Sequence, residues 1–394
     1  ASGSIIIPSN NVRKEKIHNV AIGKGTKTKV NVNIGTSTLN VNIDEEIEKA
    51  KVAVKYHADT IMDLSDGGDV GIVRRKLLEV APITFGTVPI YEAYNFGVEK
   101  HKNPLDITED DFLKAFENNI KDGVDYTTIH SGITKEIAKR ILKVERHAGV
   151  VSKGGTITAA WMLKYDKENP YITHYDYMME LAQKYDVTFS LGDALRPGSI
   201  LDSHDELQVQ EMINISRLAK LANEKDVQVM IEGPGHVPLN EVAANVRLAK
   251  SLIGDVPYYV LGPLVTDIAS GHDHIASAIG AAVSASEGVD LLCYLTPSEH
   301  LALPNAEEVK ARLISSARDI GLNPFSQGYG LVHGPSAIDQ TLLITSANLF
   351  LGRLDDSMSG VVIEKELTFQ NTDTDKKNVS IEIPKNLPTQ VEVS

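Results

Sequence analysis

Short β-rich runs alternate with longer amphipathic runs from about residue 29 to residue 300. The longer runs, such as 44–57, 109–121, 206–225 and 241–252, have the apolar spacing of helices that cover a core. Regular alternation of apolar strands with helices predicts a parallel sheet. The nine predicted strands are Lys29–Gly35, Thr60–Ser65, Ile83–Ile90, Tyr126–Gly132, Gly149–Ser152, Val187–Asp193, Val227–Gly233, Tyr258–Gly262 and Leu291–Leu295.

Eight strand–helix units would close a (β/α)8 barrel, and an open doubly wound sheet is the alternative. One of the nine strands is therefore surplus, and the weakest, Gly149–Ser152, is a candidate loop. Polar residues crowd the carboxyl ends of the strands, where a barrel carries its active site, and this favours the barrel. Any one of them could simply open a loop. They are Asn33, Asp63, His130, Ser152, Asp193, Glu232 and His300.

The regular alternation of strands and helices ends after Pro304. Runs 307–320 and 338–351 have helical spacing, 328–334 is a glycine-rich loop, and 367–393 contains short alternating stretches typical of strands. The predicted fold is α/β, a (β/α)8 TIM-type barrel with a divergent α+β C-terminal extension. Its parts are an N-terminal arm at 1–28, the catalytic barrel at 29–305 and a C-terminal unit at 306–394, which is a candidate for dimerisation.

Composition narrows the class of protein. A net charge of −14 argues against a nucleic-acid surface, although one local Arg, Lys or helix N-terminus suffices for a phosphate ligand. Cys293 is the only cysteine, so no intrachain disulfide and no multi-cysteine metal site can form. We expect neither a membrane span nor a signal peptide, and we expect a cytoplasmic protein.

Two short sequences carry the strongest chemical signals. Residues 232–238 place Glu232 and His236 in a rigid turn of glycines and prolines after a strand, which suits metal ligation or acid–base work. Residues 191–199 place Asp193 at a strand end and Arg196 in the next loop, where a guanidinium matches phosphate. The structural alternatives are a turn without chemistry and an Asp–Arg pair that braces a loop.

Three weaker signals have structural explanations that compete with the functional ones. Ser152-Lys153-Gly154-Gly155 could form an anion cradle of backbone amides, but such sequences are common in turns. His300 follows the last strand and could complete a metal site with His236. Residues 271–274 contain two histidines at the start of a helix, where capping is the simpler explanation.

Together these stretches resemble the phosphomethylpyrimidine synthase (ThiC) family, in the same order, over about residues 5 to 305. The resemblance implies a (β/α)8 barrel, usually a dimer, that converts aminoimidazole ribotide to hydroxymethylpyrimidine phosphate for thiamin biosynthesis. The family uses S-adenosylmethionine and a [4Fe–4S] cluster. The matching stretches are 29–35, 58–65, 86–91, 128–130, the two loops at Ser152 and Asp193, the Glu232 turn, 261–268 and 292–300.

The resemblance also assigns residues. Arg196, Ser152 and His130 would hold phosphate, while Asn33, Asp193 and Glu232 would hold ribose and base. His236 and His300 would bind a divalent metal, iron or zinc, and Glu232, Asp193 and His130 are the candidate catalytic residues. The full substrate-binding set is Asn33, Met62, Tyr91, His130, Ser152, Lys153, Asp193, Arg196, Glu232 and Tyr259.

The chain also departs from the family. It lacks the three-cysteine motif that carries the [4Fe–4S] cluster, so we do not expect a cluster on this chain, and radical chemistry started by this chain is disfavoured. Asp66 stands where the family usually has Thr, Ala194 where it has Gly, and His272 where it has Tyr.

These observations predict a diverged ThiC-like enzyme, a lyase or a related activity, that acts on a small phosphorylated nucleotide-like substrate in cofactor biosynthesis. S-adenosylmethionine is a candidate cofactor, and no nucleic-acid or membrane partner is expected. One alternative is biosynthesis of a different cofactor without its own cluster, for example the iron–guanylylpyridinol cofactor of a methanogen hydrogenase, because the composition suits an archaeal source. Another is a non-catalytic nucleotide-binding scaffold.

Overall fold

The structure is a computed structural model of the chain that describes residues 3–13, 17–269, 271–297 and 299, together with four short strand segments further on. The chain forms two compact units, Ala1–Pro304 and Asn305–Ser394. Each unit is described by itself below.

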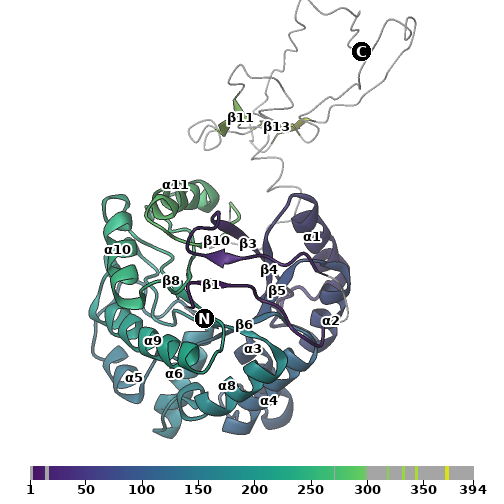
Figure 1. Ribbon diagram of the computed structural model, residues 1–394, viewed down its shortest axis with the longest axis vertical. Helices are drawn as coiled ribbons and strands as arrows, with labels where there is room; N and C mark the ends of the chain where they lie inside the picture. Colours follow the sequence, from purple (N-terminus) through teal and green to yellow (C-terminus); the bar gives the residue numbers. More distant parts are fainter. Residues whose placement is uncertain are drawn as a thin grey trace, which may run out of the picture. The chain divides into compact units, whose positions relative to one another are not determined.

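A closed barrel of eight parallel strands forms the first unit (Figure 1). The strands pair in the order β10-β3-β4-β5-β6-β7-β8-β9, so the last strand closes onto the first through Leu291 and Lys29. The predicted barrel is confirmed, and the open sheet is excluded. The strands are β3 (Lys29–Ile34), β4 (Thr60–Asp63), β5 (Thr84–Thr87), β6 (Tyr126–Ile129), β7 (Thr188–Leu191), β8 (Val229–Gly233), β9 (Tyr258–Val260) and β10 (Leu291–Cys293).

The ninth predicted strand, Gly149–Ser152, is a loop that leads into helix α6 (Lys153–Tyr165). Ser152 is the N-cap of this helix, and its Oγ accepts a hydrogen bond from the Gly155 amide at 3.1 Å. A run of four residues can be extended without a neighbour to pair with, because periodicity alone does not supply a partner strand.

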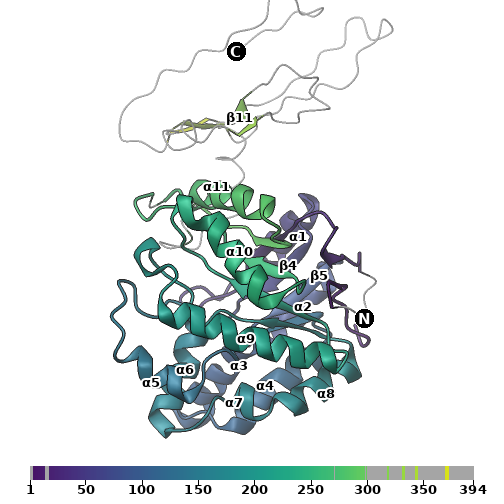
Figure 2. The ribbon, with the colours of Figure 1, turned by 60° about the vertical axis from the view of Figure 1, so that its left-hand side comes forward.

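Helices surround the barrel, and their starts follow from side-chain capping. Asn42 and Asp69 each accept a backbone amide of the helix that follows, and Thr108 forms a capping box with Asp111. Figure 2 shows α9 and α10 crossing the outside of the strands. The helices are α1 (Ile43–Lys55), α2 (Val70–Val80), α3 (Pro89–Phe96), η1 (Gly97–His101), α4 (Glu109–Lys121), α5 (Lys135–Ile141), α6, α7 (Pro170–Thr173), α8 (Tyr175–Tyr185), η2 (Ile200–Asp202), α9 (Glu206–Glu224), η3 (Leu239–Glu241), α10 (Val242–Ile253) and α11 (Asp273–Ser286).

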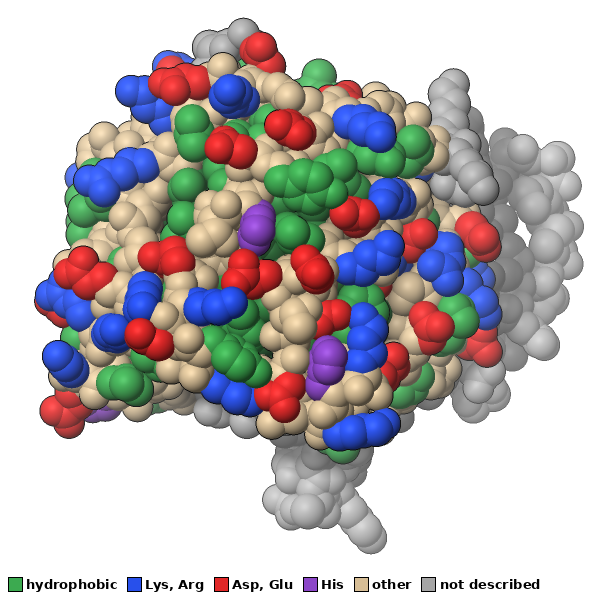
Figure 3. All heavy atoms as spheres, turned by 90° about the horizontal axis from the view of Figure 1, so that it is seen from below, with side chains coloured by type: hydrophobic (Ala, Val, Ile, Leu, Met, Phe, Trp, Pro, Cys, Tyr) green, Lys and Arg blue, Asp and Glu red, His purple; other side chains and the backbone are tan. Residues whose placement is uncertain are grey.

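Buried side chains fill the space between strands and helices in two large groups and one small one, which consists of Leu264, Ala276 and Leu295. The largest group includes Phe116, Phe189 and Tyr258, and the second joins β3, β4 and β5 to α1 and α2 through residues such as Phe85 and Leu77. Among the described residues no helix is long and apolar enough to cross a bilayer. On the face drawn in Figure 3, Lys and Arg are interspersed with Asp and Glu, so this face has no continuous basic surface.

The N-terminal arm is tied to the barrel by buried polar contacts. β1 (Ile5–Ile6) pairs antiparallel with β2 (Ile22–Gly23). Between these strands, Arg13 pairs with Asp125 and also donates to the Ala81 carbonyl at 2.6 Å, and the Arg13 side chain is only 3% exposed. Asn10 donates to two carbonyls, those of Ile120 and Val124, at 2.8 Å. These contacts fix the arm against the segment that leads into β6.

The second unit is described only at four short strands. β11 (Ala317–Arg318) pairs with β12 (Leu331–Val332), and β13 (Leu342–Ile344) pairs with β14 (Phe369–Asn371). The sequence predicted helices over 307–320 and 338–351 and a loop over 328–334. Strands occupy 317–318, 342–344 and 331–332 instead, so the prediction is wrong at those residues. Short apolar runs such as Leu342–Ile344 fit either a strand or a helix, and pairing with a distant segment decides between them. The remaining predictions for 306–394 lie outside the described residues.

Candidate functional site

A cavity of about 80 Å³ opens among the carboxyl ends of the barrel strands. Nine of the ten residues predicted to bind substrate line it, and they come from most of the strands and the loops that follow them. Because the carboxyl ends of all parallel strands in a barrel meet at one rim, residues far apart in sequence converge there. The nine are Asn33, Met62, Tyr91, His130, Ser152, Asp193, Arg196, Glu232 and Tyr259.

His130 follows β6 and is buried against the start of α6. Its Nε2 lies 3.2 Å from Ser152 Oγ. Ser152 Oγ accepts the Gly155 amide and keeps one hydrogen and a second lone pair, so it can either donate to Nε2 or accept from it. Burial, assisted by the nearby Arg196 charge, lowers the pKa of His130 to about 3. His130 is therefore a neutral hydrogen-bonding group in the free site.

Gly154 permits this close approach. A Cβ atom at this position would lie 2.2 Å from Cε1 of the His130 ring, far inside contact distance. The Ser152-Lys153-Gly154-Gly155 sequence therefore has a packing role at the site, as a helix start that fits under an imidazole.

Two carboxyl groups line the cavity: Asp193, buried in the loop after β7, and Glu232, partly buried near the end of β8. Thr128 and Ser190 donate to Glu232 Oε1 at 2.8 and 2.9 Å. Burial raises the pKa of both carboxyls, and the Glu232 charge adds to the shift at Asp193. Arg196 opposes the shift, with Nη1 3.3 Å from Asp193 Oδ1. This pair therefore holds a proton more readily than exposed carboxylates do.

Glu211 on α9 supports the loop that carries Asp193 and Arg196. Its Oε2 accepts the Leu195 amide at 2.6 Å, and burial with the nearby Asp193 charge raises the pKa of this carboxyl well above its ordinary value. Sequence reasoning missed Glu211, because its spacing is that of an ordinary helical residue.

Lys153, the tenth predicted residue, does not line the cavity. Its ammonium group pairs with Asp66 and lies 5.0 Å from the centre of the Tyr91 ring and 5.7 Å from that of Tyr94. Burial lowers the pKa of Lys153. Tyr91 lines the cavity, so Lys153 contacts a residue of the cavity wall while its ammonium group is paired with Asp66.

Two polar residues that the sequence analysis did not assign to the site, Asn31 and Cys293, contact residues that line the cavity. Asn31 donates to Tyr259 Oη at 2.9 Å, and Asn33 donates to Cys293 Sγ at 3.1 Å. Burial raises the pKa of Cys293 to about 12, so this thiol stays protonated. Alternation along β3 could have indicated Asn31, since it shares a face with Asn33. Other lining residues missed are Leu64, Val88, Thr128, Gly233, Val260 and Leu261.

The predicted metal pair is described for one member only. His236 is buried, and its Nδ1 lies 2.9 Å from Asp267 Oδ1. His300 lies outside the described residues. Among the residues that the structure does describe, no three His, Cys, Asp or Glu side chains gather closely enough to hold a metal ion. A histidine held through one ring nitrogen by a carboxylate is a usual arrangement for a metal ligand, so His236 itself fits the role.

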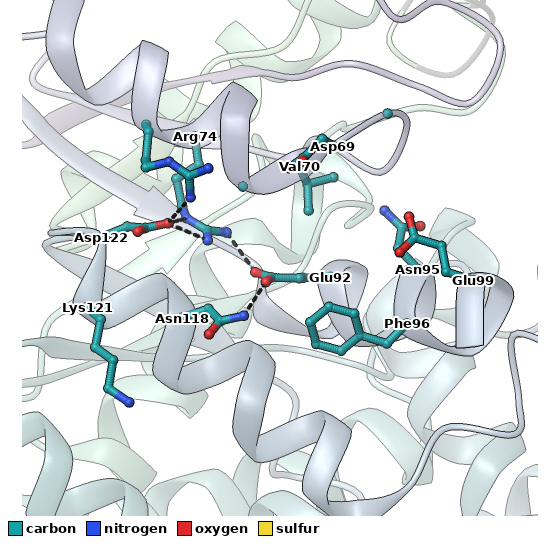
Figure 4. Close-up of a pocket in the computed structure, with 13 residues that line it drawn as sticks. Asp69, Val70, Arg74, Glu92, Asn95, Phe96, Glu99, Asn118, Lys121 and Asp122 are labelled. Carbon is teal, nitrogen blue, oxygen red and sulfur yellow. Dashed lines mark hydrogen bonds and ion pairs between the residues drawn. The ribbon is translucent and has the colours of Figure 1, made fainter. Parts of the chain in front are cut away.

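A larger cavity, of about 360 Å³, lies outside the barrel against α2, α3 and α4 (Figure 4). Its wall is held by Arg74, which donates to Glu92 at 2.8 Å and to Asp122 at 2.6 Å. Asn118 completes the contacts of Glu92 at 2.7 Å. These groups satisfy one another across three helices, and we interpret them as structural.

Comparison with known proteins agrees with the geometry of the rim. Residues 1–318 match the radical SAM ThiC family. The chain is 51% identical over 316 residues to the phosphomethylpyrimidine synthase of Ignicoccus hospitalis, which covers 80% of this chain and 72% of the relative. It is 50% identical over 332 residues to that of Pyrococcus furiosus, with 84% and 77% covered. A bacterial relative from Finegoldia magna, with the same name, is 50% identical over 314 residues, with 80% and 72% covered. This chain belongs to the radical SAM ThiC family.

Proposed function

We propose that this chain is a ThiC-like enzyme of thiamin biosynthesis that binds aminoimidazole ribotide, or a closely related phosphorylated nucleotide, at the barrel rim. The convergence of nine predicted residues on one cavity carries the proposal. The names of relatives at about half identity support the reaction class, the formation of hydroxymethylpyrimidine phosphate.

Arg196 is the proposed phosphate anchor. It is the cationic side chain in the lining of the cavity, and its guanidinium matches two phosphate oxygens. Ser152 and His130 stand beside it as neutral hydrogen-bonding groups. His130 Nδ1 has no hydrogen-bond partner in the structure, so in the tautomer with its hydrogen on Nδ1 this atom can donate to a phosphate oxygen. Asn33 and the two carboxyls are then left for the ribose and the base.

Asp193 and Glu232 are the proposed proton-transfer groups. Burial raises the pKa of both carboxyls, and the Glu232 charge adds to the shift at Asp193, so the pair holds one proton more readily than exposed carboxylates do. In the proposal, the protonated member donates to the bound nucleotide and the ionised member accepts. Thr128 and Ser190 keep Glu232 oriented, so the proton is held at Oε2 and Oε1 accepts from the hydroxyls.

A divalent metal, iron or zinc, is proposed on His236 and His300, where it would polarise a substrate oxygen. The residues do not fit a [4Fe–4S] cluster held in the family's way, since Cys293 is the only cysteine and is buried in the barrel. This mismatch favours a second candidate function, the biosynthesis of a different cofactor on the same nucleotide site. Binding of S-adenosylmethionine and a homodimer remain expectations from the family.

Calorimetric titration with aminoimidazole ribotide tests the proposal. We expect saturable binding by the wild type and a loss of at least about tenfold in Arg196→Ala, since a hydrogen bond to a charged group contributes about 1.5–3 kcal/mol. The control is Arg75→Ala, an exposed arginine of α2 that pairs with Asp122 and does not line the barrel cavity, and it should leave the affinity unchanged. Absence of binding by the wild type, or equal affinity in both variants, refutes the nucleotide site. A non-catalytic scaffold would bind the nucleotide and give no product.

Anaerobic purification with metal and sulfide analysis separates the two candidate functions. One iron or zinc per chain without sulfide, lost in His236→Ala, favours the metal-site enzyme with altered chemistry. Four irons per chain with matching sulfide would instead favour the family reaction, carried out with a [4Fe–4S] cluster.

A further inference from the structure

Asp267 lies in the loop between β9 and α11 and contacts two other loops of the rim. Its Oδ1 accepts from His236 Nδ1 at 2.9 Å, in the loop after β8. Its Oδ2 accepts from Ser199 Oγ at 2.7 Å and from the Ile200 amide at 2.9 Å, in the loop after β7. One carboxylate therefore joins three consecutive loops: Oδ1 contacts the loop after β8, and Oδ2 contacts the loop after β7.

Backbone contacts hold His236 and the Asp267 loop in register. The Val237 amide donates to the Leu264 carbonyl at 3.0 Å, and the Leu264 amide donates to the Gly235 carbonyl at 2.7 Å. The His236 side chain is 11% exposed and that of Asp267 is 32% exposed. The imidazole thus meets Asp267 from a fixed backbone.

We propose that Asp267 is a positioning residue that fixes the tautomer and the orientation of His236. A carboxylate at Nδ1 can only accept, so the hydrogen of the neutral ring lies on Nδ1 and the lone pair on Nε2. A metal ion is then bound through Nε2. The value of this arrangement for metal binding rests on the proposed function, whereas the tautomer does not.

The loop donors predict what an amide would do at this position. Ser199 and Ile200 both donate to Oδ2, so Asp267→Asn places its carbonyl oxygen there and turns its NH₂ group toward His236. The ring must then accept at Nδ1 and carry its hydrogen on Nε2. The substitution is nearly isosteric, yet it reverses the tautomer and removes the lone pair that a metal needs.

Nitrogen NMR of the full chain with ¹⁵N-labelled histidine tests the tautomer without any metal. At about pH 8.5, above the ordinary histidine pKa of about 6.5, we expect the Nδ1–H form in the wild type and the Nε2–H form in Asp267→Asn. The matched control is Asp255→Asn, an exposed carboxylate paired with Lys24, which should leave His236 unchanged. An Nε2–H form in the wild type, or the same form in wild type and Asp267→Asn, overturns the proposal.

Zinc titration against a competing chelator gives the second readout. We expect Asp267→Asn to bind zinc about 10- to 100-fold more weakly than Asp255→Asn does, the range found for residues that orient metal ligands. If the tautomer reverses but even the wild type binds no zinc, the proposed metal site fails while the positioning role of Asp267 stands. If zinc affinity is unchanged although the tautomer reverses, Asp267 does not position His236 for a metal, and that part of the inference is overturned.

Discussion

Asp63 offers a test of how burial controls protonation at the barrel rim. It ends β4, is 5% exposed, and its Oδ1 accepts the Ser65 amide at 2.9 Å. Burial raises the pKa of Asp63 from 3.8 to about 6, although hydrogen bonds from Ser65 and the charge of Arg74 oppose the shift. We consider the substitution Asp63→Asn, which keeps an oxygen for the Ser65 amide and cannot ionise.

The sign of the effect follows from the raised pKa. The folded state binds the proton more tightly than the unfolded state, so the stability contributed by this proton is full below about pH 4 and is lost as the pH rises toward 6. A shift of about two pKa units corresponds to roughly 3 kcal/mol, because one unit is 1.36 kcal/mol. The ionised wild type should carry this cost at neutral pH, and Asp63→Asn should not.

Urea unfolding at about pH 4.5 and pH 7.5 measures the difference. Trp161 is the only tryptophan and is 2% exposed, so its fluorescence reports unfolding of the barrel. We expect Asp63→Asn to be more stable than the wild type by up to about 3 kcal/mol at the higher pH, and by much less at the lower one. Asp63→Ala, which leaves the Ser65 amide without its acceptor, serves as the control. An equal difference at both pH values would refute the reasoning.

Three further predictions concern the arm and the site. Arg13→Ala leaves a buried carboxylate unpaired and should lower the free energy of unfolding by about 3–5 kcal/mol, measured by urea unfolding; a loss below 1 kcal/mol would contradict this account. Arg196→Lys should weaken nucleotide binding in calorimetry, because a point charge cannot contact two oxygens, and unchanged affinity would count against bidentate binding. Gly154→Ala should displace His130 and weaken the same binding with an unchanged circular dichroism spectrum, whereas Gly71→Ala, whose added Cβ would lie no nearer than 3.2 Å to a neighbouring atom, should leave the binding unchanged.

Local pattern was sufficient for the elements of the barrel. Strand β8, for example, begins with the apolar run Val229-Met230-Ile231, which is buried on both faces. The helices between the strands have capping residues, such as Thr108, that can be recognised in sequence. Because parallel strands present their carboxyl ends at one rim, the sequence also predicts that Asn33, Arg196 and Glu232 lie close together, and all three line the cavity. Their roles as ligands of a nucleotide stay predictions.

The sequence did not indicate which distant segments pair as strands. Gly149–Ser152 has the composition of a strand but no neighbour, and Leu342–Ile344 has the spacing of a helix but pairs with Phe369–Asn371. Backbone hydrogen bonds need a partner in space, and periodicity records only the face that a segment would bury. For this reason the prediction differs from the structure mainly at Gly149–Ser152 and within the predicted C-terminal helices.

The sequence by itself therefore determined the barrel, the rim and the identity of most side chains that face the cavity. Only the tertiary structure decided which atoms those side chains meet. Asp267 is 31 residues from His236, and Asn33 is 260 residues from Cys293, yet each pair is in hydrogen-bond contact. Burial and partners of this kind set the pKa of His130 and of the carboxyl pair, because protonation depends on the surroundings of a group and not on its position in the chain.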